Sequence, residues 1–172
     1  MKFSSIITKY IAPGVYGATD GIVTTFAVIG GVYGANLSPV IVLILGMSNV
    51  FADGFSMAAS NYLSRRSERV EEGEGGHALP AFKSSLATFV AFIVIGMIPL
   101  LPFICAVFVD ISSSNQFAWS IFATFSAFAL LGLVRGKVTK KNLFMTALET
   151  IVVGGIAAGI AYGVGVMLKG LA

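Results

Sequence analysis

The stretch that decides the fold of this 172-residue chain is residues 39–64, PVIVLILGMSNVFADGFSMAASNYLS. It is long and apolar enough to cross a bilayer as a helix, which takes about 20 residues. Its apolar run is interrupted at every fourth position by Asn49, Asp53, Met57 and Asn61. Residues four apart share one helix face, so these side chains form a single line along a membrane helix.

The composition of the whole chain is that of an integral membrane protein. Hydrophobic residues make up 56% of it and charged residues 11%, with a mean hydropathy of +0.91, whereas a soluble domain carries about 25% charged residues. Five apolar segments can span a bilayer, approximately residues 14–35, 39–64, 84–109, 116–134 and 144–168. We therefore predict an all-α integral membrane protein with five transmembrane helices, forming a single transmembrane domain over residues 1–172.

The basic residues predict how the chain is oriented. With a cytoplasmic N-terminus, ten of the eleven Lys and Arg residues lie on the cytoplasmic side and only Lys169 lies on the other. This positive-inside pattern places the N-terminus in the cytoplasm and the C-terminus outside. The net charge of +3 then reflects membrane topology and not a nucleic-acid partner. In this orientation, residues 65–83 are predicted to form a short charged cytoplasmic connection with no separate soluble domain.

Two further features concern the packing of the spans. Pro99 and Pro102 predict a kink near the outer end of the third span. Glycines four residues apart in residues 14–35 and in residues 144–168 allow close approach of helix backbones. That approach occurs either within one protomer or at a dimer interface.

The candidate functional site consists of side chains that are unusual at membrane depth. An ionisable group there costs roughly 2.5–3.5 kcal/mol on insertion scales and usually marks a pathway or binding site. Counting about 1.5 Å per residue from the cytoplasmic ends of the spans, we expect Asp20, Met57 and Glu149 at one level. Asp53 then lies about one turn deeper.

Each of these residues also has a purely structural interpretation. Glu149 can pair with Lys140 or Lys141 at the membrane surface, and Asp20 can cap a broken helix. The two asparagines in residues 39–64 can hydrogen-bond to neighbouring helices, and the methionine of that line can simply pack in the core.

The ligand types predict which ion such a site would bind. Carboxylate and amide oxygens suit Mg²⁺, Ca²⁺ and Mn²⁺, whereas a thioether favours softer ions, so the mixture fits Fe²⁺, Mn²⁺ or Co²⁺. The predicted metal ligands are Asp20, Asp53, Met57, Asn49, Asn61 and Glu149. The first three give one protomer three ligands, and a two-fold axis would raise this to the six of an octahedral ion. We therefore expect a homodimer. Carboxylates at this depth can also exchange protons.

A second acidic group lies outside the membrane. On the helical extension that we expect to run to Gly73, Glu68, Glu71 and Glu72 share one face. They form either a solvated helix face with local Arg–Glu pairs or a patch that captures metal ions at the pathway mouth.

Three segments resemble the vacuolar iron transporter family: YGATDGIVTTFAVIGGVYGA at 16–35, GMSNVFADGFSMAASNYLSRRSE at 46–68, and GGIAAGIAYGVGVML at 154–168. The resemblance implies a five-helix protomer and a homodimer with the ion path between its subunits. It also implies proton-coupled movement of Fe²⁺ or Mn²⁺ out of the cytoplasm. By motif, Asp20 and Met57 match the family's pathway aspartate and methionine.

The chain departs from the family pattern in two places. Many members read Gly-Glu-Tyr where this chain has Ser60-Asn61-Tyr62, so one carboxylate is absent, and Asp53 can compensate for it. The best-known branch also carries a long cytoplasmic helical domain between its second and third spans, for which residues 65–83 are too few. The chain therefore resembles the short-loop, bacterial or nodulin-like branch.

Together these features predict a divalent transition-metal transporter that is not an enzyme, carries no cofactor, and antiports protons against Fe²⁺ or Mn²⁺. The alternatives are a non-transporting membrane scaffold whose polar line packs helices, and a transporter of another cation or small solute. The expected location is a bacterial inner membrane, or alternatively a vacuolar or other organelle membrane.

Overall fold

A computed structural model describes the backbone of residues 2–72 and 80–171 and the side chains of residues 11–67 and 80–171. Within these residues the chain is helical and contains no strand, which confirms the all-α prediction. The helices are α1 (Lys2–Gly34), α2 (Pro39–Glu72), α3 (Ala81–Gly96), α4 (Leu101–Cys105), α5 (Ser113–Thr139) and α6 (Leu143–Leu168), with 3₁₀ turns η1 (Ile98–Leu100) and η2 (Lys169–Leu171).

Five segments of these helices are long and apolar enough to cross a membrane, as predicted. They are Ile11–Gly34, Pro39–Ser67, Ala81–Cys105, Ser113–Thr139 and Leu143–Leu171. The first helix begins well before the predicted span, and α2 continues to Glu72, next to the predicted stop at Gly73. The chain is therefore a multi-pass membrane protein.

The third span is broken where its prolines predicted a kink. Helix α3 ends at Gly96, and η1 and α4 follow it with Pro99 and Pro102 in their first turns. A proline cannot donate a backbone hydrogen bond, so carbonyl groups near it lose their helical partners. The hydroxyl of Ser120 on α5 donates to the carbonyl oxygen of Pro99 at 2.7 Å, which satisfies one of them inside the membrane.

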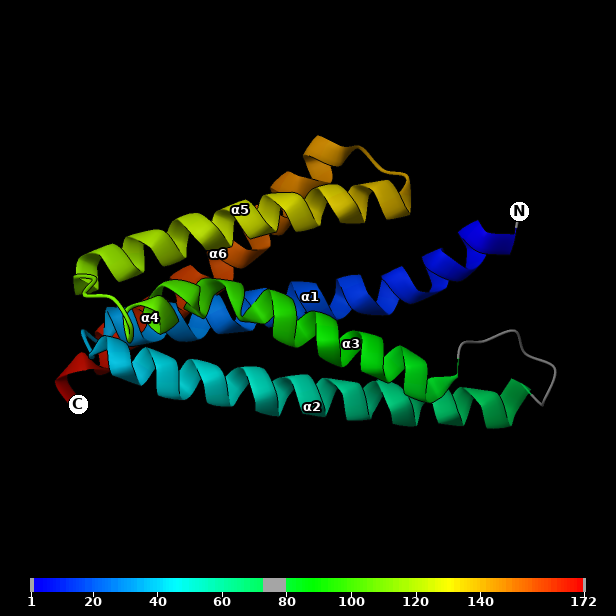
Figure 1. The fold of residues 1–172 in the computed structure, drawn as a ribbon, viewed down its shortest axis with the longest axis horizontal. Coiled ribbons are helices and arrows are strands. Elements are labelled where there is room, and N and C mark those ends of the chain that lie inside the picture. The colour runs from blue at the N-terminus through cyan, green and yellow to red at the C-terminus, as the bar shows by residue number, and fades with distance from the viewer. Residues whose placement is uncertain (1, 73–79, 172) are drawn as a thin grey trace.

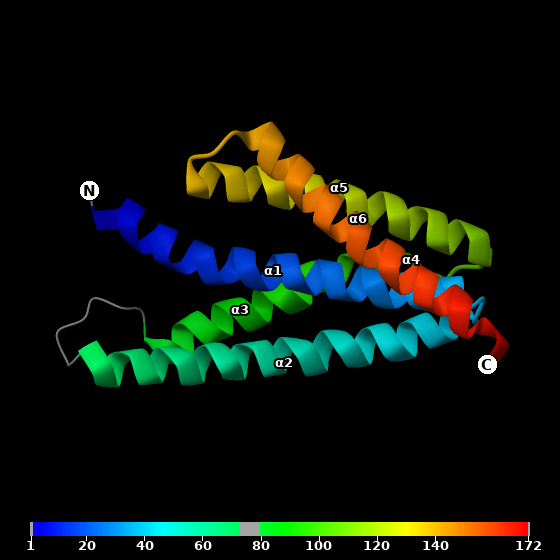
Figure 2. The same ribbon diagram turned by 180° about the vertical axis from the view of Figure 1, so that it is seen from behind.

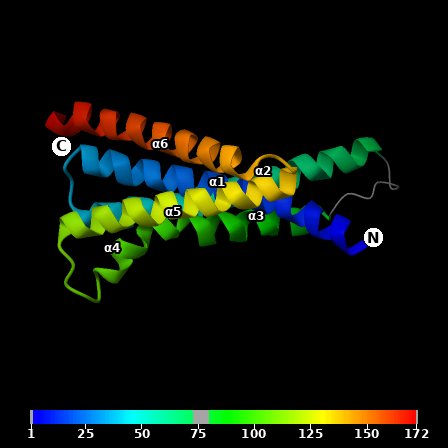
Figure 3. The same cartoon turned by 90° about the horizontal axis from the view of Figure 1, so that it is seen from above.

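Helix α1 lies at the centre of the bundle (Figure 1). It packs mainly against α3 and α6, whereas α2 packs mainly against α3. The pair α2 and α3 lies on one side of α1, and the hairpin of α5 and α6 lies on the other (Figures 1 and 2). Seen from above, the long helices run roughly along one axis, and the two ends of the chain lie at opposite ends of the bundle (Figure 3).

Glycines of α1 allow this helix to pack closely against two of its neighbours, α3 and α6. A Cβ atom added at Gly21 would lie 2.5 Å from the carbonyl oxygen of Phe92 on α3, and one at Gly30 would lie 2.9 Å from that of Ala158 on α6. Contacts this short require glycine, so α1 uses its small residues for packing inside the protomer.

The glycines of α6 behave differently. Gly155, Gly159 and Gly163 would place a Cβ atom in open space, with nothing within 4 Å. Packing within the protomer is therefore the correct interpretation for Gly21 and Gly30 of α1, whereas this stripe of α6 closes no contact inside the protomer.

Candidate functional site

The turn between α1 and α2 sets the register of these two antiparallel helices. Asn36 takes a left-handed conformation with φ of 59°, and the backbone N–H of Leu37 donates to the carbonyl of Val32 at 3.1 Å. Asp20 lies fourteen residues before the end of α1 at Gly34, and Asp53 lies fourteen residues after the start of α2 at Pro39. At 1.5 Å per residue both are about 21 Å from the turn.

The structure brings these two carboxyl groups together. Asp20 and Asp53 are both half-buried and lie close enough to interact electrostatically. Helix α1 runs unbroken through Asp20, so the capping role considered for this residue is wrong. Two like charges held close inside a membrane are unfavourable unless a cation or a proton compensates them.

A hollow of about 360 Å³ lies one turn away from the carboxyl pair, between α1 and α2. It is lined by Tyr16, Met57, Ser60, Asn61, Ser64 and Arg65. Tyr16 and Met57 are each eighteen residues from their end of the turn, which explains why they face the same space. The predicted level of Met57 is thus wrong by one turn, because Met57 pairs with Tyr16 while Asp20 pairs with Asp53.

Four of the residues that line this hollow were not among the predicted ligands: Tyr16, Ser60, Ser64 and Arg65. The signal that could have found Tyr16 is its position four residues before Asp20, on the same helix face. Residues 60 and 64 likewise lie three positions after two members of the polar line of α2, Met57 and Asn61, and so share its helix face.

Asn61 is engaged in hydrogen bonds between helices. Its Nδ2 donates to the hydroxyl of Thr88 at 3.0 Å, and its Oδ1 accepts from the hydroxyl of Ser84 at 3.1 Å. The same oxygen accepts from Nε of Arg65 at 3.2 Å. Both ends of the amide are occupied, which favours the interhelical role over metal binding for this residue.

Asn49 shows the opposite situation. Its Nδ2 is buried without a hydrogen-bond partner among the described residues, and the same holds for the hydroxyl of Thr25 on α1. The two residues lie ten and nine residues from the turn, about one turn beyond the carboxyl pair. Buried polar groups without partners are rare. At this level, one polar group on α1 and one on α2 are left without a hydrogen-bond partner among the described residues.

Glu149 lies elsewhere in the fold. Its Oε2 is 3.7 Å from Nη2 of Arg135, and the two side chains are 52% and 39% exposed. The first half of α6 packs on α5, whereas its second half crosses α1 (Figure 2). The ion pair therefore joins α5 to α6 and uses Arg135 in place of the predicted Lys140 or Lys141.

No group of three or more His, Cys, Asp or Glu side chains that could hold a metal lies in the described part of the chain. One protomer offers Asp20, Asp53 and the thioether of Met57. The predicted capture patch, Glu68, Glu71 and Glu72, has its side chains outside the described residues and stays a prediction from the sequence.

Comparison with known proteins identifies the family. The model of the VIT family matches residues 11–75 and 70–166. The chain belongs to this family, that of the vacuolar iron transporters.

Curated relatives carry the same name. The vacuolar iron transporter of Plasmodium berghei is 24% identical over 220 residues, covering 90% of this chain and 81% of the relative. That of Toxoplasma gondii is 25% identical over 94% of this chain and 75% of its own length. Vacuolar iron transporter 1 of Tulipa gesneriana is 22% identical over 90% and 85%, respectively.

These matches also show a length difference within the family. The 220-residue match to the Plasmodium berghei protein covers 90% of this chain, or about 155 residues, so about 65 positions have no counterpart here. The family match is broken into two parts that meet at residues 70–75. The two parts of the family match join at the C-terminal end of α2, which ends at Glu72.

Proposed function

We propose that this protein moves a divalent transition metal, Fe²⁺ or Mn²⁺, out of the cytoplasm in exchange for protons, along the seam between α1 and α2. The observation that carries the proposal is the pair of interacting carboxyl groups, Asp20 and Asp53, within two membrane spans. A cation bound between them, or a proton when the cation leaves, would relieve their repulsion. The names of the relatives support iron as the cargo.

Along the seam the ion would meet its contacts in a fixed order. The hollow beside Met57 lies at the end of the bundle that holds most basic residues, which the positive-inside rule assigns to the cytoplasm. An ion entering there meets a thioether first and then the two carboxyl groups. Asn49 follows one turn later and would contact a cation through its amide oxygen, since the Nδ2 that lacks a partner can only donate hydrogen bonds. A thioether next to carboxylates favours Fe²⁺ or Mn²⁺ over Mg²⁺.

We further propose that two protomers share this site. One chain gives three ligands, which is too few for an octahedral ion. A stripe of α1 that includes Asp20, Thr24 and Ala27 is half-buried in the single chain, and α3 and α6 cover the other faces of this helix. A two-fold axis along the stripe would place both Asp20 side chains in one pathway.

The transport proposal is tested with purified full-length protein in proteoliposomes. Uptake of Fe²⁺, Mn²⁺, Co²⁺, Zn²⁺ and Mg²⁺ is compared side by side, with and without a pH gradient. We expect Fe²⁺ and Mn²⁺ to be taken up fastest and to move protons the opposite way. Uptake of no metal above empty liposomes would favour the scaffold alternative, and movement of metal without protons would remove the antiport part.

The dimer is tested by cysteine crosslinking in the membrane. In a Cys105→Ser background, Thr24→Cys is expected to form a disulfide between subunits. Ile160→Cys, on the exposed side of α6, is the matched control and is expected to form no disulfide between subunits. Crosslinks from position 160 and none from position 24 would place the axis on α6 and remove the six-ligand site.

The proposed orientation is compatible with more than one membrane. We propose a bacterial inner membrane with a cytoplasmic N-terminus, and a vacuolar or other organelle membrane is the alternative that the names of the relatives favour. Both place the basic end of the bundle in the cytoplasm.

A further inference from the structure

The face of α2 opposite the carboxyl seam forms a groove with α3. On α2, Phe55 and Tyr62 project about 160–180° around the helix from Asp53, at 100° per residue. Because these side chains lie on the opposite face of α2 from Asp53, the groove is separate from the proposed metal pathway. The groove has a volume of about 290 Å³.

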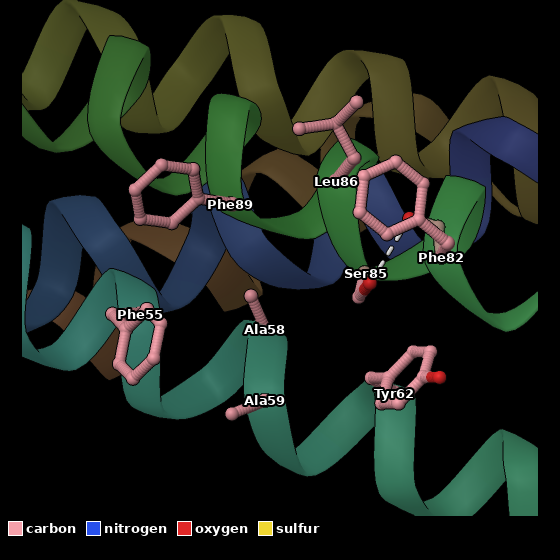
Figure 4. Close-up of a pocket in the computed structure, with 8 residues that line it drawn as sticks. All are labelled: Phe55, Ala58, Ala59, Tyr62, Phe82, Ser85, Leu86 and Phe89. Atoms are coloured by element: carbon pink, nitrogen blue, oxygen red, sulfur yellow. Dashed lines mark hydrogen bonds between the residues drawn. The ribbon is translucent and has the colours of Figure 1, made fainter.

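The shape of the groove comes from small residues between large ones. Ala58 and Ala59 of α2 leave a gap that Phe55 bounds at one end and Tyr62 at the other (Figure 4). From α3, aromatic and aliphatic side chains form the opposite wall. The groove is open and almost entirely apolar, and it lies along two candidate membrane spans.

One end of this apolar groove is bordered by positive charge. Arg66 follows Tyr62 by one turn on the same face of α2, and Lys83 follows Phe82 directly on α3. Both side chains are exposed, and neither forms an ion pair within the described part of the chain. Arg65 differs, because its Nε already donates to Asn61.

These features together match one kind of molecule. An alkyl chain fits an apolar groove that faces the bilayer, and a phosphate group fits the arginine and lysine at the end of the groove. Tyrosine is enriched at the level of the lipid headgroups. We propose that the α2–α3 groove binds an anionic phospholipid, with one acyl chain between Phe55 and Tyr62 and the phosphate at Arg66 and Lys83.

Such a lipid would act as a structural ligand. It contacts α2 and α3 at once, and a ligand that binds only the folded state raises stability. Because α2 carries Asp53 and Met57 on its other face, the lipid would also hold one wall of the proposed pathway in place.

The probes are phosphatidylglycerol, phosphatidylcholine with the same acyl chains, and glycerol phosphate without acyl chains. Each is added to the purified full-length protein in detergent, and retained lipid is counted by native mass spectrometry alongside the melting temperature. We expect phosphatidylglycerol to be retained and to raise the melting temperature, phosphatidylcholine to do so more weakly, and glycerol phosphate to do neither.

Two variants and one control assign the effect to the groove. Arg66→Gln with Lys83→Gln should weaken phosphatidylglycerol binding on the order of tenfold, since each basic residue contributes to the attraction. The double variant Lys140→Gln, Lys141→Gln removes the same charge between α5 and α6 and should leave binding unchanged. Ala59→Leu fills the gap and should reduce retention of both phospholipids.

Three outcomes would overturn the proposal. Equal losses in both double variants would mean that only overall charge attracts the lipid. Binding of glycerol phosphate as strong as that of phosphatidylglycerol would make the site one for free phosphate. A disulfide between subunits from Phe82→Cys in the Cys105→Ser background would show that a second copy of the chain fills the groove.

Discussion

Helix α1 has two kinds of seam with its neighbours. Its seams with α3 and α6 are closely packed through glycines, since a Cβ atom at Gly21 or Gly30 would nearly touch a backbone carbonyl of the neighbouring helix. The seam with α2 is looser and carries polar side chains: Asp20 and Asp53 lie close enough to interact electrostatically, and a hollow lies beside Met57. The same helix thus holds the bundle together on one side and presents carboxyl groups on the other.

This difference follows from the physics of packing in lipid. An apolar side chain gains little by leaving lipid for a protein interior, so tight contact in a membrane comes from small residues and hydrogen bonds. A seam without such residues stays loose enough for a polar path. Loss of a carboxylate and loss of a glycine should therefore damage different properties of the protein.

The largest effect is expected at the open seam. Asp20→Asn keeps the shape of the side chain but removes its charge and its exchangeable proton, so metal uptake into proteoliposomes should fall to background. Melting temperature should not fall, because the change also removes the repulsion from Asp53. Asp110→Asn, an exposed carboxylate between α4 and α5, is the control and should transport normally. Wild-type uptake by Asp20→Asn would remove the pathway assignment.

The next largest effect is expected at the closed seam. Gly21→Ala forces a methyl group against the carbonyl of Phe92 on α3, and overpacking of this kind costs about 1–3 kcal/mol. The melting temperature in detergent should fall by several degrees. Gly159→Ala makes the same chemical change in open space on α6 and should leave it unchanged. Equal melting temperatures for the two variants would show that the α1–α3 seam is not tightly packed in the membrane protein.

Much of this architecture was predictable from the sequence. The length of the apolar segments sets the number of spans, and Pro99 marks the break in the third span because proline cannot continue the hydrogen-bond ladder. The polar line of residues 39–64 follows from helical periodicity alone. Each of these features depends on local chain geometry, which a single sequence determines well.

The register between helices could not be read as easily. The cytoplasmic ends of the spans were located from composition, which changes gradually along the chain, so their positions are imprecise. Depths counted from these ends therefore placed Met57 level with Asp20. Counting from the tight turn at residues 35–38 gives the observed pairing, because a short turn fixes both helices at once. The partner of Glu149 was missed for a related reason: Lys140 is used in the turn itself, with φ of 55°, and Arg135 lies further back on α5.

A smaller effect is expected where polar residues serve packing. Asn61→Ala removes the hydrogen bonds to Thr88 and Ser84 on α3. Hydrogen bonds between membrane helices contribute about 0.6 kcal/mol on average, so the melting temperature should fall by a few degrees. Uptake per folded protein should change little. A loss of uptake at unchanged melting temperature would instead place Asn61 among the metal ligands.

The smallest effect, and the most selective, is expected at Met57. Met57→Leu keeps the volume nearly constant, and such exchanges usually cost less than about 1.5 kcal/mol, so folding should be preserved. The change removes the soft thioether from the hollow beside Tyr16 but leaves both carboxyl groups in place. Uptake of Fe²⁺ and Co²⁺ should therefore weaken several-fold more than uptake of Mg²⁺, since only the softer ions use sulfur.

Competition measurements with mixed ions would show this change in preference directly. Met47→Leu is a suitable control, because Met47 packs against the hydrophobic core and lies on no part of the hollow. That variant should leave the order of ion preference as it is. Equal losses for all ions in Met57→Leu would mean that the methionine only shapes the hollow, and the preference for softer ions would then have to come from elsewhere in the seam. Since the carboxyl pair by itself offers only hard oxygen ligands, the contrast between the two methionines decides whether the seam recognises its ion by charge alone or by charge and softness together.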